Sequence, residues 1–218
     1  MDFSRRDLFS YLIEDSLSQT DDSLRVVGGD LVIDPELAIR AGRQTTASTT
    51  SALLFLWAKH LEICRKLRKE IDSTISSGVA LPHSVLEGKP YLERCINEVM
   101  RLYPAVLSGV PRETGPKGLT IDGVFISPFN MVSVPTYAIH RGNRGFYRSQ
   151  KPQIPQQFIS ERWMSKSDLI IKKEAFIPFS FGPYACAKKG FAMVKIRLLI
   201  TTIVRNFEFR FPPGQEQQ

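Results

Sequence analysis

The sequence predicts a mainly α-helical protein with a small β portion. Five segments have the apolar spacing or the start and stop signals of helices, and residues 119–126 read as a hairpin with an Asp-Gly turn. The chain has 218 residues, of which 43% are hydrophobic and 23% charged. These values are typical of a globular protein with a buried core, and they argue against a low-complexity or disordered chain.

The helices are expected at about residues 4–18, 34–57, 60–76, 91–102 and 187–205. Asp34 can cap the second helix, and Pro35 suits its first position. Gly78 with Pro82 stops the third helix, and Pro104 stops the fourth. The last helix has five candidate buried residues, which are Phe191, Val194, Leu198, Ile200 and Ile203.

The β portion is expected in the middle of the chain and at its end. Residues 119–121 and 124–126 flank the Asp-Gly turn and predict a hairpin. Residues 131–139 are apolar and β-branched, which predicts another strand. Residues 141–165 read as an irregular surface segment, and the alternation in residues 207–211 predicts a final strand.

The chain is basic, with 29 Lys and Arg against 22 Asp and Glu, a formal net charge of +7. Such a balance favours an acidic partner, which can be a nucleic acid, a membrane surface or an acidic protein. A solvated basic face explains it equally well. A nucleic-acid binder would rest on charge alone, without a recognised motif, and we expect no nucleic-acid partner.

Three cysteines, Cys64, Cys95 and Cys186, are too few for a disulfide scaffold and fit a reducing compartment. The longest apolar run covers the seven residues 52–58, whereas a membrane span needs roughly 18 to 20. The first residues are charged and lack the apolar stretch of a secretory signal. We therefore expect no membrane anchor in this chain and a cytoplasmic location for it alone.

Hydroxyl side chains fill the middle of the second expected helix, at six of the seven positions 45–51. β-branched residues form helices poorly, and Ser and Thr hydroxyls can bond back to the preceding turn. One interpretation is a helix that loosens here and exposes a groove for a ligand. The other is a polar stripe packed against other helices.

A carboxylate and two guanidiniums form the second candidate cluster. Glu98 and Arg101 lie three apart on one helical face, where they can pair. Such pairs are common on surfaces and contribute little alone. Arg162 lies in the aromatic irregular segment, and a guanidinium can share a carboxylate through two hydrogen bonds. A buried Glu98 with both arginines would lock that segment onto the helix.

The most informative segment is residues 176–190, where a Gly-Pro turn delivers Cys186 just before the last helix. A helix N-terminus stabilises a thiolate. A nucleophilic cysteine needs a base, and no histidine is placed by pattern; a zinc site needs further Cys or His ligands at the usual spacing, and these are absent. The remaining interpretation is that one thiolate binds a cofactor that brings its own other ligands, as haem does.

Taken together, the motifs resemble the C-terminal portion of the cytochrome P450 family, in its fungal microsomal type. Four motifs stand in the family's order, and the segments 86–92 and 135–141 are similar to fungal members. The four are residues 41–46, the Glu-x-x-Arg of Glu98 and Arg101, the Glu-Arg-Trp of residues 161–163, and the Phe-x-x-Gly-x-x-x-Cys of Phe179, Gly182 and Cys186. The resemblance implies one partial domain over residues 1–218, with the family's N-terminal half absent.

The resemblance also implies a haem-thiolate monooxygenase, with haem b as the cofactor and Cys186 as the axial metal ligand. The other implied cofactor-binding residues are Arg112, Phe179, Gly182 and Tyr184. Thr45 would help deliver protons to dioxygen, with Gln44 in the place of the family's usual acidic residue. Glu98, Arg101 and Arg162 would form a structural triad. The edge of the substrate pocket would be formed by Val106, Leu107 and Ser108.

The family implies a small hydrophobic substrate, an NADPH-dependent flavoprotein reductase and the cytosolic face of the endoplasmic reticulum membrane. Three residues depart from the family's pattern. They are Gln44, Tyr184 where most members have Arg or His, and Lys188 where a small residue is usual. Gln44, Lys188 and the missing half keep a second interpretation open, a truncated, non-catalytic remnant that binds haem or a partner at most weakly.

Overall fold

The structure is a computed structural model. It describes Ser10, Tyr11, Glu14 and residues 33–73, 86–142, 145–146 and 156–215. The chain divides into two compact units, Met1–Thr45 and Thr46–Gln218, and each is described by itself. Of the helix expected at residues 4–18, only Ser10, Tyr11 and Glu14 are described, and all three are helical. The rest of that segment lies outside the described residues.

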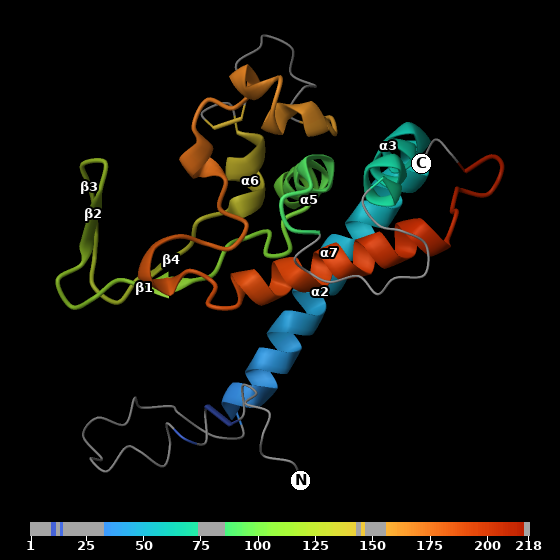
Figure 1. The fold of residues 1–218 in the computed structure, drawn as a ribbon. Helices are drawn as coiled ribbons and strands as arrows, with labels where there is room; N and C mark the ends of the chain where they lie inside the picture. The colour runs from blue at the N-terminus through green and yellow to red at the C-terminus, as the bar shows by residue number, and fades with distance from the viewer. Residues whose placement is uncertain are drawn as a thin grey trace. The chain divides into compact units, whose positions relative to one another are not determined.

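The helix α2 (Ile33–Lys59) begins one residue before the expected cap Asp34 and ends two residues after the expected end (Figure 1). It stays α-helical through the hydroxyl-rich residues 45–51. The loosening considered from the sequence is therefore absent there. Burial of Thr46, Thr49 and Thr50 matches the other interpretation, a packed polar stripe.

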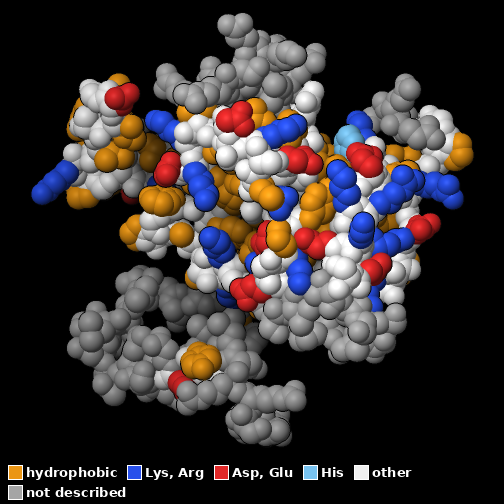
Figure 2. All heavy atoms as spheres, turned by 45° about the horizontal axis from the view of Figure 1, so that its top comes forward, with side chains coloured by type: hydrophobic (Ala, Val, Ile, Leu, Met, Phe, Trp, Pro, Cys, Tyr) orange, Lys and Arg blue, Asp and Glu red, His pale blue; other side chains and the backbone are white. Residues whose placement is uncertain are grey.

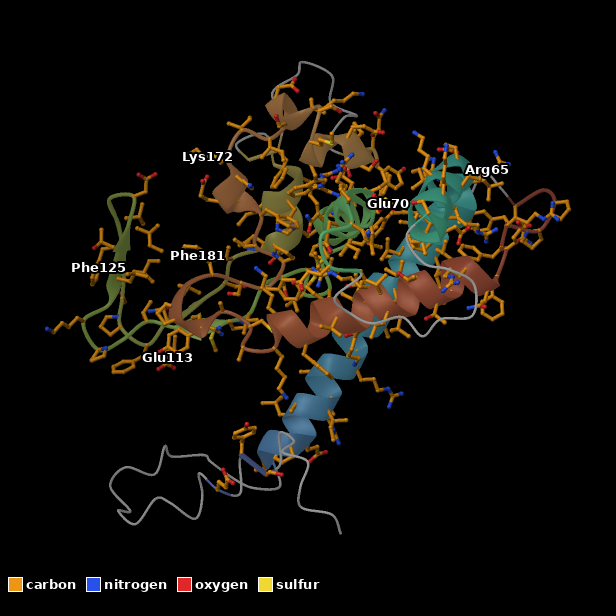
Figure 3. All side chains as sticks on the ribbon, viewed as in Figure 1. Arg65, Glu70, Glu113, Phe125, Lys172 and Phe181 are labelled. Atoms are coloured by element: carbon orange, nitrogen blue, oxygen red, sulfur yellow. The ribbon has the colours of Figure 1, made fainter. Side chains whose placement is uncertain are left out.

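Two amphipathic helices follow, α3 (Leu61–Asp72) and α5 (Pro90–Leu102). A carboxylate of α3 joins them, because both oxygens of Glu70 accept hydrogen bonds at 2.9 Å from the backbone N–H groups of Tyr91 and Leu92 (Figure 3). These are N–H groups in the first turn of α5, which have no partner inside the helix. Glu70 therefore caps a helix that lies about twenty positions further along the chain.

The helix α7 (Lys189–Asn206) packs against α3. It begins two residues later than expected, and of the five expected buried residues only Ile200 is fully buried. Phe191 is exposed, while the other three are half-buried. The buried face of α7 instead consists of Met193, Ile196, Ile200, Thr201 and Val204.

The expected hairpin is confirmed as β2 (Leu119–Ile121) paired antiparallel with β3 (Val124–Ile126). Asp122 and Gly123 have φ of 51° and 81°, as a tight primed turn between two strands requires. The strand expected at residues 131–139 is wrong beyond its start. Only β4 (Met131–Val132) is a strand, and it pairs with β1 (Arg112–Glu113).

Residues 136–139 of that expected strand instead belong to the helix α6 (Thr136–Arg141), which packs against α5. Pro135 precedes α6 and has no N–H to donate to a sheet, so pairing ends before it. The irregular segment after α6 is described in part. It contains the short 3₁₀ helix η2 (Ser160–Trp163), which also packs against α5.

The strand expected at residues 207–211 is also wrong, because this segment has no strand partner among the described residues. Side-chain contacts fix it instead. Arg68 of α3 donates hydrogen bonds to the carbonyls of Val204 and Phe207 and to the carboxylate of Glu208. Phe209 lies 6.5 Å from Trp57 between ring centres.

The core joins apolar side chains of α2, α3, α5 and α7. Its largest buried apolar side chain is Trp57, and Leu53, Leu67, Ile96 and Ile200 have no exposed surface. On the face that Figure 2 shows, hydrophobic side chains lie between many Lys and Arg side chains. The prediction of a mainly helical fold with a small β portion is confirmed. No helix among the described residues combines the length and apolarity needed to cross a bilayer.

Candidate functional site

Main-chain hydrogen bonds shape the cysteine loop, which we define as residues 176–188. Ser180 N–H donates to Ile177 O at 3.0 Å, and Cys186 N–H donates to Phe179 O at 2.9 Å. Ser180 and Gly182 have φ of 64° and 78°, and a Cβ added at Gly182 would meet nothing within 4 Å. The loop therefore folds back on itself and ends at Cys186, three residues before α7 begins.

Cys186 is the exposed member of the three free cysteines. Cys95 is fully buried, and burial raises the pKa of its thiol well above the ordinary value. Cys64 is half-buried, and burial raises its pKa as well. The exposed thiol therefore belongs to the cysteine that the sequence singled out, and the other two are held in their neutral form.

Two exposed aromatic side chains, Phe181 and Tyr184, precede Cys186 in the loop, and a guanidinium lies over one of their rings. Phe181, labelled in Figure 3, is 80% exposed, and Tyr184 is 75% exposed. Arg112 of β1 places its guanidinium carbon 5.5 Å from the centre of the Tyr184 ring, a cation–π distance. The structure thus brings two of the expected cofactor-binding residues together, from segments about seventy positions apart.

The remaining expected cofactor-binding residue with a side chain, Phe179, is half-buried and packs against the core. Lys189 of α7 lies over its ring at 5.9 Å. Phe179 therefore anchors the cysteine loop to the helical body, while Phe181 and Tyr184 stay exposed. Lys188, the unusual residue noted from the sequence, is the residue before α7 and is half-buried.

The expected edge of the substrate pocket lies between α5 and β1, and its side chains are exposed. Val106 and Leu107 are 39% and 55% exposed, and Ser108 is exposed too. Their backbone is held in place: Leu107 O accepts from Tyr137 N–H at 3.0 Å, and Ser108 O accepts from the Ser133 hydroxyl. An ordered main chain with exposed apolar side chains can line a pocket for an apolar ligand.

The structure brings Glu98, Arg101 and Arg162 together in the interior, all with fully buried side chains. Arg101 uses Nε and Nη2 to donate to both carboxylate oxygens of Glu98, at 3.0 and 2.9 Å. Arg162 donates through Nε to Oε1 at 3.2 Å. Burial lowers the pKa of Arg162, and the negative charge of Glu98 opposes that change. The cluster thus joins α5 to η2.

Sequence reasoning missed two members of this region, Trp163 and His140. Trp163 donates its indole N–H to Oε2 of Glu98 at 2.9 Å, although only its aromatic character was noted. His140 accepts a hydrogen bond from the backbone N–H of Ile177, at the start of the cysteine loop. Neither pairing is local in sequence, so no spacing pattern could have shown it.

The expected catalytic pair lies in the first unit, at its boundary. Thr45 is half-buried and donates its hydroxyl hydrogen bond to Ala41 O at 2.7 Å, while Gln44 is exposed. The cysteine loop belongs to the second unit. Thr46, the next residue, is buried, and Thr50 donates to its carbonyl at 2.9 Å.

The donor set of the second unit fits a haem. A thiol that is exposed, rings that offer flat apolar surface and a guanidinium that can pair with a carboxylate are the groups that such a cofactor needs. Among the described residues, no three His, Cys, Asp or Glu side chains form a metal-binding group. Cys186 is the cysteine of the second unit that could hold the iron of such a cofactor, so the class of site that these residues fit is a haem site with one cysteine ligand.

Comparison with known proteins agrees with this class. The family model for cytochrome P450 matches residues 2–218. The chain belongs to the cytochrome P450 family, whose members are monooxygenases and therefore oxidoreductases. This family implies a haem with a cysteine ligand.

Similar proteins are fungal. The chain is 48% identical to cytochrome P450 monooxygenase nodW of Hypoxylon pulicicidum over 96% of this chain and 37% of that protein. It is 34% identical to cytochrome P450 monooxygenase eupD of a Phoma species over 97% of this chain and 71% of that protein. It is 34% identical to tryprostatin B 6-hydroxylase of Aspergillus fumigatus, over 96% of this chain and 36% of that protein. The chain thus spans little more than a third of the length of two of these relatives.

Proposed function

We propose that this chain is the C-terminal part of a haem-dependent monooxygenase that inserts one oxygen atom of O2 into an organic substrate. Cys186 is the proposed axial ligand, because it is the exposed cysteine and its loop is fixed by main-chain hydrogen bonds. This exposed thiol is the observation that carries the proposal. When bound, a haem with a thiolate ligand supplies the reductive activation of dioxygen.

The residues around Cys186 have proposed roles in holding the group. Arg112 would pair with a propionate carboxylate, and its position over the Tyr184 ring supports this role by limiting the freedom of the guanidinium. Phe179 and Gly182 would set the course of the loop. The network of Glu98, Arg101 and Arg162 would be structural, since all three side chains are fully buried. Residues 1–218 would form one partial domain.

Thr45 and Gln44 are the proposed catalytic residues. The Thr45 hydroxyl would hold a proton at Oγ1 for delivery to the reacting oxygen, and Gln44 would form hydrogen bonds beside it. A Gln side chain carries no carboxylate proton, so this delivery would rest on the hydroxyl and on water. Val106, Leu107 and Ser108 would border the pocket of a small hydrophobic substrate.

The proposed electron donor is an NADPH-dependent flavoprotein reductase, and the proposed location is the cytosolic face of the endoplasmic reticulum membrane, as is typical of fungal family members. Lys172, Lys173, Lys188 and Lys189 give the region of the cysteine loop a positive charge. Charge complementarity with an acidic reductase would mainly raise the rate of docking.

A spectroscopic experiment tests the proposal. The chain is reconstituted with haem, reduced, and exposed to carbon monoxide, and we expect the red-shifted Soret band that marks thiolate ligation. Cys186→Ser should abolish that band, whereas Cys64→Ser, at a half-buried cysteine away from the loop, should leave it unchanged. A band that survives in Cys186→Ser would overturn the assignment.

A non-catalytic remnant is the second candidate, and the observation that favours it is Gln44 in place of the family's acidic residue. It predicts that the chain is poorly soluble, binds haem weakly at most and shows no turnover even with a reductase. Gln44→Asp and Gln44→Glu separate the candidates. A product yield that rises in these variants supports an enzyme limited by proton delivery, and an unchanged absence of product supports the remnant.

A further inference from the structure

One buried histidine connects the Glu98 network to the cysteine loop. His140, the fifth residue of α6, has a side chain with no exposed surface. Its Nε2 accepts a hydrogen bond from the backbone N–H of Ile177 at 3.0 Å. Its Nδ1 lies 3.3 Å from the carbonyl oxygen of Met100 in α5. The imidazole therefore bridges α5 and the start of the cysteine loop.

These two contacts select one form of the ring. A backbone N–H can only donate, so the Nε2 atom that faces Ile177 must carry a lone pair. A backbone carbonyl can only accept, so the Nδ1 atom that faces Met100 must carry the proton. A doubly protonated ring would place an N–H against the N–H of Ile177. The bridge therefore requires the neutral ring with its proton on Nδ1.

The surroundings of the ring favour this neutral form. Phe146 and Phe176 lie 6.0 and 5.3 Å from it between ring centres. The pKa of His140 is lowered to about 4, chiefly by burial and with smaller contributions from the positive charges of Arg101 in α5 and Arg141 in α6. The hydrogen bond to the carbonyl of Met100 opposes them. The ring is therefore neutral at the pH of a cell.

The main chain of the same residue belongs to the buried network. Arg101 donates through Nη1 to the carbonyl oxygen of His140 at 3.1 Å, while its other nitrogens hold Glu98. His140 is thus fixed through its backbone by a buried arginine, and its side chain extends to Ile177. The carboxylate of Glu98 in α5 and the cysteine loop are joined through two residues, Arg101 and His140.

From Ile177, two further hydrogen bonds lead to the cysteine. Ser180 N–H donates to Ile177 O, and Cys186 N–H donates to Phe179 O. We propose that His140 is a positioning residue for the cysteine loop. With its proton on Nδ1, its side chain holds the main chain that presents Cys186 in place relative to the buried Glu98–Arg101 network. The inference rests on the proposed function, because that function makes Cys186 the axial ligand. The effect of His140 on the backbone is nevertheless measured without haem.

Two substitutions of His140 test its two hydrogen bonds separately. The amide of Asn lies near the position of Nδ1, so His140→Asn retains the contact with Met100 and loses the acceptor for Ile177. The amide of Gln reaches the position of Nε2, so His140→Gln retains an acceptor for Ile177. His60→Gln is the matched control, because His60 precedes α3 and its ring pairs with Glu62 and stacks on Phe158, neither of which belongs to the cysteine loop.

The experiment is amide hydrogen exchange of the full 218-residue chain without cofactor, together with the ¹⁵N signature of the His140 ring. We expect His140→Asn to speed exchange across residues 177–186 by about tenfold, as the loss of one buried hydrogen bond implies, with α3 unchanged. His140→Gln should restore protection, and His60→Gln should have no effect. The wild-type ring should show its proton on Nδ1.

Equal exchange in His140→Asn and wild type, equal acceleration in the Asn and Gln variants, or a ring protonated at Nε2 would each overturn the proposal. If the Asn variant unfolds, the proposal is still tested by the ¹⁵N signature of the wild-type ring and by the protection of residues 177–186 from exchange in the Gln variant. Failure of the proposed function is seen separately, as a thiolate band that survives in Cys186→Ser. The two failures are therefore distinguishable.

Discussion

The indole N–H of Trp163 donates to Oε2 of Glu98 at 2.9 Å, so a side chain of η2 completes the set of donors around a buried carboxylate of α5. The backbone N–H of Ile159 donates to Oε1 of the same carboxylate at 3.0 Å. With Arg101 and Arg162, these donors satisfy a charge that would otherwise be costly to bury. One side chain thus fixes the irregular segment to the helix.

Glu98→Gln should lower the free energy of unfolding by about 3–5 kcal/mol, because it leaves two buried guanidiniums without their counter-charge. Urea unfolding followed by circular dichroism measures the loss. The control is Glu208→Gln, which removes an exposed partner of Arg68 and should cost less than about 1 kcal/mol. Equal losses in the two variants would contradict the importance of this buried network.

Glu70→Ala should lower the free energy of unfolding by about 1–2 kcal/mol, because two N–H groups of the first turn of α5 lose their acceptor. Hydrogen exchange at Tyr91 and Leu92 should become faster in the variant. Lys66→Ala, an exposed change in the same helix, should stay within about 0.5 kcal/mol of wild type. A Glu70 variant as stable as the Lys66 variant would show that the cap has no effect.

The protein should lose stability as the pH falls from about 6.5 towards 4. The pKa of His140 is lowered to about 4 by burial, and an unfolded histidine has a pKa near 6.5. In this range the unfolded chain binds a proton that the folded chain does not, so acid favours unfolding. The full contribution of this group is about 3 kcal/mol, present above pH 6.5 and lost below pH 4.

Urea unfolding at several pH values between 7 and 4.5 measures this dependence. His140→Gln should have a shallower slope than wild type, and His60→Gln should keep the wild-type slope. Identical slopes in wild type and His140→Gln would mean that another group causes the dependence.

Tyr184→Leu should weaken haem binding by about two- to fivefold, the effect expected when a guanidinium loses an aromatic surface. Tyr184→Phe should bind as tightly as wild type, because the ring over which Arg112 lies is kept. A Soret titration of the chain with haem gives both affinities. Loss of affinity in Tyr184→Phe would instead assign the contribution to the hydroxyl.

Gly109→Ala should destabilise the protein more than Gly123→Ala does, although both glycines have positive φ. A Cβ at Gly109 would lie 2.0 Å from the carbonyl oxygen of Val134, whereas a Cβ at Gly123 would meet nothing within 4 Å. We expect a loss of about 1 kcal/mol at Gly123 from the backbone alone, and about 1–3 kcal/mol more at Gly109 from the clash. Thermal unfolding measures both, and equal shifts would contradict the close approach.

Local signals were enough to predict α2, α3, α5, α7 and the hairpin, whereas α6 was missed. Asp122 and Gly123 favour a primed turn whatever surrounds them, and Pro90 marks the start of α5. The strands expected at residues 131–139 and 207–211 failed because a strand needs a partner. After Val132 the chain turns into α6 at Pro135, and the final segment packs by side chains.

The candidate site was predictable only where its residues stand close in sequence. The spacing of Glu98 and Arg101 and the loop before Cys186 are visible as motifs. The Arg112–Tyr184 contact and the bridge of His140 join segments dozens of positions apart. Phe191 was expected to be buried from helical spacing alone, and it is exposed because the buried face of α7 runs through Met193 and Ile196 instead.

The hydrogen bonds within the loop that presents Cys186 join carbonyl and amide groups of the main chain, which every residue type except proline supplies. Substitutions at Phe181 or Tyr184 can therefore accumulate during evolution without changing the path of the chain. The path of the loop and the chemistry of its exposed side chains, Phe181 and Tyr184, therefore depend on different groups. A change at either exposed side chain should therefore leave the sulfur in place.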